Sequence, residues 1–312
     1  MKIADINEIN RKANENAREF ANECEKDYTG KLEEAARFIA SRIKESPVVL
    51  ISGPSASGKT TSAKRLELTL ESFGINAHLI SLDDYFKTRD ERNSALDPKN
   101  KVDLESPDCL DIPLLNRHLK SLSRGEEILV PKFDFVRQAR MDKATPLRLK
   151  KDEIAVIEGI HALNDAITGE IGGKATKMYV SVRTRIGQND RVIIRPEWLR
   201  LIRRSVRDSN FRGAPAERTL SLWKSIRQGE TRYIMPFKHS ADIKLDTFLG
   251  YEACVLGPIV SGKFSKVPRG VFEEAQSEGI LDVIDMFRPI SCDMVPGDSI
   301  LREFIGGSSI SY

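Results

Sequence analysis

The chain has 312 residues, of which 40% are hydrophobic and 30% charged, a composition that can bury one large core or two modest ones and that excludes a disordered or fibrous chain. Its 49 basic and 46 acidic residues leave a formal charge of +3, so no overall field recruits nucleic acid or an anionic membrane, and we expect neither as a partner. The four cysteines are widely spaced, the N-terminal region is polar, and no apolar run is long enough to span a membrane. We therefore expect a cytoplasmic protein without a disulfide framework or a structural zinc site.

Residues 6–43 are predicted to form one or two helices, because apolar residues such as Leu32 and Ile39 recur among charges at helical spacing. Pro47 ends this region. Residues 48–51 then form a short apolar run with β-branched side chains, which is typical of a buried parallel strand.

A helix with Leu66 and Leu70 on its apolar face is predicted next, with Gly74 placed to end it in a left-handed conformation. A second buried strand follows at 77–82. The order strand, glycine-rich turn, helix, strand is a βαβ unit, which predicts a doubly wound α/β fold around a parallel sheet. Further strands of this sheet are predicted at 154–157, 178–182 and 241–245.

Three further segments are predicted between and after these strands. Residues 127–135 alternate enough to suggest a small hairpin arm, and residues 90–107 are polar, punctuated by proline and expected to be loop. Residues 198–228 are predicted to be helical, with a break near Gly213 and Pro215. The expected units are an N-terminal helical segment at 1–46, a central domain at 47–246 that carries the parallel sheet, and a C-terminal extension packed on it at 247–312.

The strongest motif is Gly53-Pro54-Ser55-Ala56-Ser57-Gly58-Lys59-Thr60, which satisfies G-x-x-x-x-G-K-[ST] between a predicted strand and a predicted helix. The alternative is a chance glycine-rich turn, and the flanking elements argue against it. In such a P-loop the backbone N–H groups surround phosphate oxygens, Lys59 reaches the β and γ phosphates, and the Thr60 hydroxyl ligates Mg²⁺. We therefore expect a nucleoside triphosphate, ATP or GTP, with Mg²⁺ at Gly53, Ser55, Ala56, Ser57, Gly58, Lys59, Thr60 and Thr61.

Carboxylates follow two of the predicted strands. Asp83 and Asp84 come directly after 77–82, at the sheet edge where ligands of α/β proteins bind. A carboxylate there can accept the proton of an attacking hydroxyl, although a solvated acidic turn is the alternative. Glu158 ends the strand at 154–157 and is a candidate to hold Mg²⁺ directly or through water.

Four arginines, Arg200, Arg203, Arg204 and Arg207, fall on one stripe of the predicted helix, and Arg212 lies beyond it. Such a stripe is either a solvated face or a lid whose guanidinium groups neutralise charge during phosphoryl transfer. The spacing does not choose between the two. The four histidines are isolated and expected to be structural.

The combination of motifs resembles the phosphoribulokinase and uridine kinase family over about residues 48–246. The motifs are the P-loop, Ser81-Leu82-Asp83-Asp84-Tyr85-Phe86, Pro131-Lys132-Phe133-Asp134-Phe135, Glu158-Gly159-Ile160, Arg203-Arg204 with Arg207-Asp208, and Pro236-Phe237-Lys238 with Ala241-Asp242. The resemblance implies a P-loop kinase fold with a helical lid and a ribose-like acceptor hydroxyl. It also implies that Asp83 is the catalytic base beside Lys59, that Glu158 lies near the metal, and that Arg203, Arg207 and Arg212 form the lid.

The chain departs from the family where the acceptor is expected. Gln138 stands in place of the histidine that reads the base, Glu105 begins a stretch that usually reads Asp-His-Pro-Asp, and Phe211-Arg212-Gly213-Ala214 replaces Glu-Arg-Gly-Arg. Residues 296–308 resemble the tail of a uridine-kinase-like branch often fused behind threonyl-tRNA-synthetase-like segments. The residues expected to contact the acceptor are Asp84, Tyr85, Glu105, Phe133, Gln138 and Arg140.

Three functions remain open from the sequence. The first is a kinase of a nucleoside such as uridine or cytidine, and the second is a kinase of a non-nucleoside alcohol such as a pentose phosphate or a pantothenate-like compound. The third is a non-catalytic nucleotide-binding module. A homo-oligomer is possible in each case.

Overall fold

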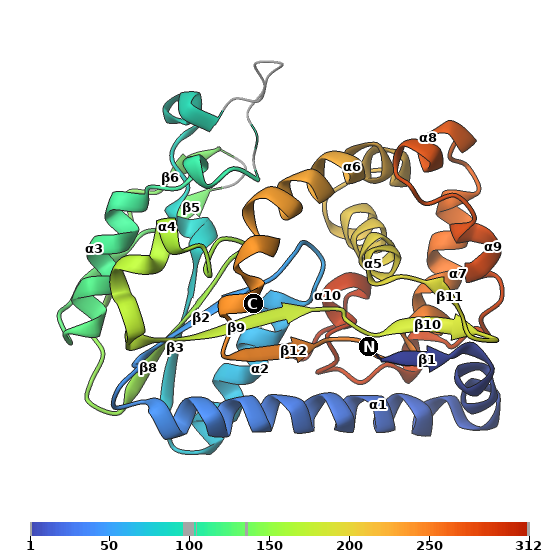
Figure 1. The fold of residues 1–312 in the computed structure, drawn as a ribbon, viewed down its shortest axis with the longest axis horizontal. Coiled ribbons are helices and arrows are strands. Elements are labelled where there is room, and N and C mark those ends of the chain that lie inside the picture. Colours follow the sequence, from blue (N-terminus) through green and yellow to red (C-terminus); the bar gives the residue numbers. More distant parts are fainter. Residues whose placement is uncertain (1, 96–102, 104, 135–136, 311–312) are drawn as a thin grey trace.

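In the computed structural model, which describes all residues except 1, 96–102, 104, 135–136 and 311–312, the centre of the molecule is a five-stranded parallel sheet (Figure 1). Its strand order is β12-β9-β2-β8-β3. The predicted parallel α/β sheet is confirmed, with strand ends displaced by at most three residues. The strands are β2 (Val48–Ser52), β3 (Asn76–Ser81), β8 (Glu153–Glu158), β9 (Ala175–Ser181) and β12 (Ile243–Asp246).

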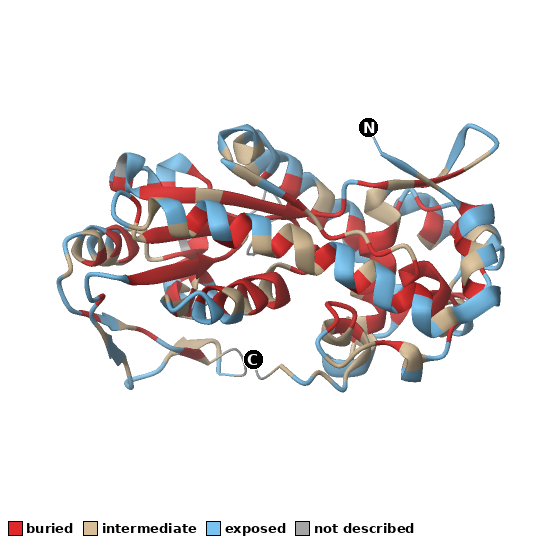
Figure 2. Cartoon of the chain, turned by 90° about the horizontal axis from the view of Figure 1, so that it is seen from below, coloured by how far each residue is buried: buried red, intermediate tan, exposed pale blue. Residues whose placement is uncertain are grey.

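Every residue of β2 is buried, because helices cover both faces of the sheet. Val49 and Ile51 join a core with α1 (Ile6–Arg42) and α2 (Lys59–Ser72). Val48 and Leu50 join a second core with α3 (Ile112–Ser123) and the segment around α4 (Asp165–Thr168). Figure 2 shows this buried centre between half-exposed helices.

The helix predicted at 6–43 is α1, which runs along the whole length of the molecule in Figure 1. It is kinked at Asn16, whose backbone is not helical (φ −158°, ψ 91°). The chain before it forms a strand that the sequence did not indicate, β1 (Ile3–Asp5), which pairs in parallel with β10 (Arg185–Gln188). β10 in turn pairs with β11 (Arg191–Ile194) through a turn at Asn189 and Asp190, both with positive φ.

Residues 198–228 were predicted to be a broken helix, and they form α5 (Pro196–Phe211) and α6 (Ala216–Tyr233). The C-terminal helices pack against these two: α7 (Glu252–Phe264) on α5, α8 (Arg269–Glu274) on α6, and α10 (Arg302–Ile305) on α5. α9 (Ile280–Ile284) packs on α7. The predicted unit boundaries near residues 47 and 246 remain predictions, and helices on both sides of them share one hydrophobic core.

The hairpin arm predicted at 127–135 extends further along the chain. β4 (Ile128–Val130) pairs with β7 (Thr145–Leu147), and β5 (Phe133–Asp134) pairs with β6 (Ala139–Arg140). Phe135 of the predicted arm and residues 96–102 and 104 of the predicted loop lie outside the described residues. The described part of that loop includes 3-10 turns, and the full set of 3-10 segments is Leu82–Tyr85, Arg89–Ala95, Pro107–Cys109, Gly169–Lys174, Met235–Ser240 and Cys292–Met294.

Over the part of the chain that the structure describes, no helix combines the length and the apolar character needed to cross a membrane.

The buried ion pair between Arg203 of α5 and Glu252 of α7 gives a test of how the C-terminal helices are held. Both side chains are fully buried, and Arg203 Nε lies 2.6 Å from Glu252 Oε2. Glu252→Gln leaves a buried guanidinium without its counter-charge, so we expect a loss of about 3 kcal/mol in the free energy of unfolding, measured by urea denaturation. Glu33→Gln, which removes the exposed pair with Arg37, is the control and should change little. Equal losses in the two variants would contradict the role given to the buried pair.

Candidate functional site

The P-loop lies at the carboxyl end of β2, as its sequence context predicted. Gly58 begins α2 with a positive φ of 84°, and Ala56 also has a positive φ. A Cβ on Gly53 would lie only 1.9 Å from the carbonyl oxygen of Val180 on β9, so only glycine lets the loop approach that strand. The turn is therefore the anion-binding geometry expected from Gly53 to Thr60.

Side chains of α5 and α6 hold the first half of this loop. Glu230 Oε1 accepts a hydrogen bond from the backbone N–H of Ser55 (3.0 Å), and Glu230 pairs with Arg200 through both carboxylate oxygens (2.6 and 2.9 Å). Arg200 also donates to the Ser55 carbonyl (3.0 Å), and Arg204 donates to the Ser55 hydroxyl. Sequence reasoning missed Glu230, because an isolated glutamate on an amphipathic helix carries no signal of its partner.

Arg203 holds the second half of the loop. Its guanidinium is fully buried, pairs with Glu252 and donates to the hydroxyl (3.2 Å) and carbonyl (2.7 Å) of Thr247. The Thr247 hydroxyl in turn donates to the Ser57 carbonyl (2.7 Å). Arg200 and Arg203 therefore do not form a solvated face, which was one of the two alternatives for the stripe. Arg203 is held behind the loop by Glu252 and Thr247, and not at the lid position that the resemblance implied.

Lys59, Asp83 and Glu158 come together where β3 and β8 end. Ser81 at the end of β3 is the register partner of Glu158 in β8, and its hydroxyl donates to Glu158 Oε1 (3.1 Å). Burial is the largest effect that raises the pKa of Glu158, and the charge of Asp83 adds to it while Lys59 opposes it. One cation thus lies close to both carboxylates.

Asp83 is exposed to solvent, but desolvation by the protein around it is the largest effect that raises its pKa. Lys59 and Arg212 oppose this rise, and Asp84 adds to it. The Lys59 amine donates to the Pro54 carbonyl (3.2 Å), so it is held at the loop. A carboxylate with a raised pKa beside a phosphate-binding lysine suits a proton acceptor.

Glu105 lies on the same side of the loop. Its pKa is raised to about 7, mainly by burial, while Arg204 and Lys59 act in the opposite direction. A Cβ on Gly229 of α6 would lie 2.7 Å from the Glu105 Cβ, so this glycine makes room for the backbone that carries the carboxylate. The structure thus brings Glu105 to Lys59, as the predicted acceptor contact requires.

Asp84 and Tyr85 differ from their prediction as acceptor contacts. Asp84 is buried and accepts hydrogen bonds from Lys132 Nζ (3.0 Å) and from the Phe133 backbone (3.2 Å), so it fastens the hairpin arm to β3. Tyr85 is 1% exposed, and its hydroxyl bonds to His118 Nδ1 (2.9 Å). Asp84 therefore supports the arm, and Tyr85 is held against α3.

Two of the remaining predicted acceptor residues, Phe133 and Gln138, contact an arginine that the sequence did not indicate. Arg92 lies between the rings of Phe86 and Phe133, with its guanidinium carbon 5.2 and 5.3 Å from the ring centres. It donates to Gln138 Oε1 (2.9 Å). Arg140 pairs with Asp111 (3.2 Å). Arg92 was missed because its segment has no regular period and was expected to be loop.

The family implies a magnesium ion, and the side chains present suit one. Thr60 supplies a hydroxyl at the first turn of α2, and Glu158 supplies a carboxylate, both oxygen donors of the kind that Mg²⁺ prefers. Among the described residues no three His, Cys, Asp or Glu side chains form a metal cage. In kinases Mg²⁺ is held by few protein ligands together with phosphate oxygens and water.

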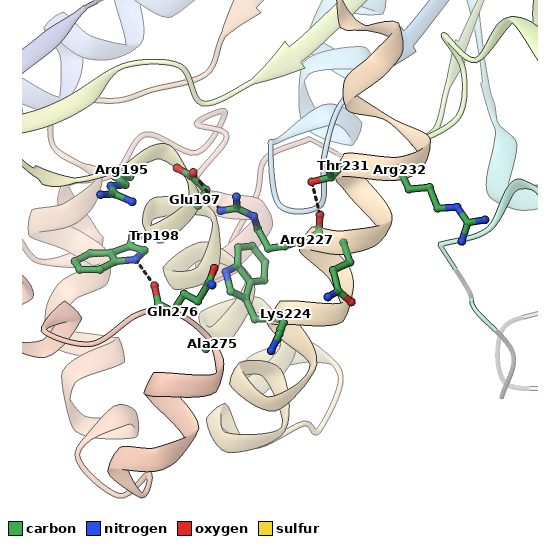
Figure 3. A pocket seen from close by; sticks show the side chains of 11 residues that line it. Arg195, Glu197, Trp198, Lys224, Arg227, Thr231, Arg232, Ala275 and Gln276 are labelled. Carbon is green, nitrogen blue, oxygen red and sulfur yellow. Dashed lines mark hydrogen bonds and ion pairs between the residues drawn. The ribbon is translucent and has the colours of Figure 1, made fainter. Parts of the chain in front are cut away.

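A separate cleft of about 450 Å³ lies between the start of α5, α6 and the residues after α8 (Figure 3). Trp198 donates from its ring to the Gln276 carbonyl (3.2 Å), and Arg227 pairs with Glu197 (3.2 Å). Lys59, Asp83 and Glu158 do not line this cleft. It is therefore distinct from the candidate active site.

Comparison with known proteins agrees with this geometry. The model of the phosphoribulokinase / uridine kinase family matches residues 48–249. A uridine kinase of Staphylococcus aureus (strain JH9) is 28% identical over 202 residues, which are 64% of this chain and 87% of that protein. The crystal structure of YFH7 from Saccharomyces cerevisiae, a candidate P-loop kinase with a circular permutation, matches with a TM-score of 0.51 at 12% identity, over 70% of this chain and 98% of that one.

The family model covers well over half of the chain, from the first strand of the central sheet to the residues just after the last one. The chain belongs to the phosphoribulokinase and uridine kinase family.

Proposed function

We propose that this small-molecule kinase transfers the γ-phosphoryl group of ATP to a hydroxyl of its acceptor, with Asp83 as the general base. The observation that carries the proposal is the position of Lys59. This cation lies at the P-loop and acts on the pKa of both Asp83 and Glu158, which end neighbouring parallel strands. A phosphate held by the loop would then face the carboxylates across Lys59.

The residues divide the work as follows. Backbone N–H groups of the P-loop and the start of α2 bind the phosphates, and Lys59 neutralises charge on the group in transfer. Asp83 takes the proton from the acceptor hydroxyl, which a carboxylate with a raised pKa does readily. Thr60 and Glu158 would hold Mg²⁺, which supplies charge neutralisation between the β and γ phosphates. The positive charge of Arg212 lowers the pKa of Asp83, so Arg212 lies near this carboxylate.

A nucleoside such as uridine or cytidine is the first acceptor that we propose, supported by the uridine kinase relative. A second candidate is an anionic alcohol such as a pentose phosphate or a pantothenate-like compound. Arg92 favours it, because no acidic partner within ion-pair distance is found for this buried guanidinium among the described residues, and one of its terminal nitrogens there has no hydrogen-bond partner. A phosphate or carboxylate would satisfy that nitrogen.

Asp83→Asn tests the base. The amide cannot accept the proton but has nearly the same size, so we expect kcat to fall by about 10² to 10⁴ while the affinity for ATP is retained. The measurements are coupled ADP release and equilibrium binding of ATP. A variant with normal turnover would show that Asp83 is not the base.

The acceptor is tested by ADP release with a panel of nucleosides, pentose phosphates, polyols and pantothenate. Uridine or cytidine should stimulate release if the acceptor is a nucleoside, and only phosphate- or carboxylate-bearing alcohols should do so if Arg92 binds an anion. In either case Arg92→Met should raise the KM for the acceptor and leave the KM for ATP unchanged. No stimulation by any compound, together with tight ATP binding, would favour a non-catalytic module.

The raised pKa of Glu105 predicts how the stability of the folded chain depends on pH. Its pKa rises from 4.5 to about 7 on folding, so between these values the folded chain binds a proton that the unfolded chain does not. The stability that Glu105 contributes is present below pH 4.5 and is lost as the pH rises through 7. Glu105→Gln should therefore melt a few degrees above the wild type at pH 8, and the difference should shrink towards pH 5. Equal differences at pH 5 and pH 8 would contradict the burial of this carboxylate.

A further inference from the structure

The C-terminal segment 299–308 lies against the P-loop, although it falls outside residues 48–249 that match the family. Ile300 is fully buried, and its Cδ1 is 3.6 Å from the position that a Cβ on Gly58 would take. Glu303 Oε2 accepts a hydrogen bond from the Thr61 hydroxyl (2.7 Å). Two side chains of this segment thus reach the first turn of α2, where phosphates of a nucleotide would bind.

This segment is fixed by its own contacts. Arg302 donates to the carbonyls of Pro296 (3.2 Å), Gly306 (3.2 Å) and Val295. Phe304 is fully buried, its carbonyl accepts from Asn210 of α5 (3.1 Å), and the guanidinium of Arg203 lies 5.5 Å from its ring centre. The segment is therefore built into the site, with its place set by α5.

A cavity of about 390 Å³ lies between this segment and the end of α5. Figure 1 shows α10, which carries Glu303, beside α5. The size is within the range of small-molecule sites. Its wall includes Thr60 from the P-loop, Arg207, Phe211 and Arg212 from the end of α5, and Glu303 and Gly306 from the C-terminal segment.

The chemistry of this wall matches a nucleoside with phosphates attached. Phe211 is 57% exposed, an unusual fraction for a large apolar ring, and a Cβ on Gly306 would lie 3.1 Å from its Cζ. The ring thus offers a face for stacking a base. Arg207 and Arg212 supply guanidinium groups for phosphate oxygens. Glu303 Oε1 has no hydrogen-bond partner among the described residues and can accept from a ribose hydroxyl.

We propose that this cavity binds the nucleoside moiety of the phosphoryl donor, with the base on Phe211 and the ribose at Glu303. The inference rests on the proposed function, since it needs a nucleoside triphosphate in the P-loop. It adds that the donor site is completed by residues 303–306, which lie beyond the family-matching part of the chain.

The test compares ATP with inorganic tripolyphosphate, which has the phosphates but no nucleoside, by calorimetry with Mg²⁺ present. Phe211→Ala should weaken ATP binding about tenfold and leave tripolyphosphate binding unchanged. Glu303→Ala should reduce the preference of the wild type for ATP over 2′-deoxy- and 3′-deoxy-ATP. Phe73→Ala, which removes an exposed ring just after α2 and away from the cavity, is the matched control and should bind ATP as the wild type does.

If both cavity variants bind ATP as the wild type does, the inference is overturned. If the wild type nevertheless turns over ATP, the proposed function stands. Parallel loss of ATP and tripolyphosphate would also overturn it, because the substitutions would then act on the P-loop and not on a nucleoside contact. A wild type that binds neither compound would overturn the proposed function itself.

Discussion

Buried contacts between α5 and the P-loop backbone are the constraint on which the rest of the site depends. Arg200 donates to the Ser55 carbonyl, and Arg203 acts on the Ser57 carbonyl through Thr247. With these carbonyls bound on the protein side, the loop is held in the curled shape that a phosphate requires. Each arginine is itself paired with a buried glutamate, so neither charge is left uncompensated. The loop is thus prepared before any nucleotide binds.

The carboxylates around Lys59 are less well balanced by positive charge than the arginines that hold the P-loop. Asp83, Glu158 and Glu105 all have raised pKa values, and burial or desolvation is the first cause for each. Placing several carboxylates around one lysine, where the surrounding protein desolvates them, is unfavourable for the folded chain, and such local conflicts are expected where binding or catalysis uses the groups. A bound cation and a proton-donating hydroxyl would both relieve this repulsion. The same repulsion that is unfavourable for the folded chain therefore favours the ligands of a phosphoryl transfer.

Local patterns carried the predictions that succeeded. The P-loop, the buried strands on either side of it and the acid at the end of 77–82 each depend on neighbours within a few residues, so the sequence alone could place them. The periodicity of α5 correctly placed its arginines on one stripe, but it could not say whether that stripe faces water. The answer depends on Glu230 and Glu252, which are 30 and 49 residues away from their partners. β1 was not predicted, because a strand of three residues carries little pattern and its partner, β10, lies far away in the sequence.

The donor and acceptor sides that we propose for the site are held by different parts of the chain. The donor side is fixed from behind by α5 and α7 and closed by the C-terminal segment, whose Glu303 reaches Thr61. The acceptor side depends on the hairpin arm, which Asp84 fastens to the end of β3 through Lys132 and Phe133. Because Asp84 holds the arm while α5 and Thr247 hold the loop, we expect residues of the arm to change without disturbing nucleotide binding. The departures from the family at Gln138 and the insertion of Arg92 between two rings lie in this arm and its neighbours, so the acceptor is the part of the reaction that this separation leaves free to differ from uridine.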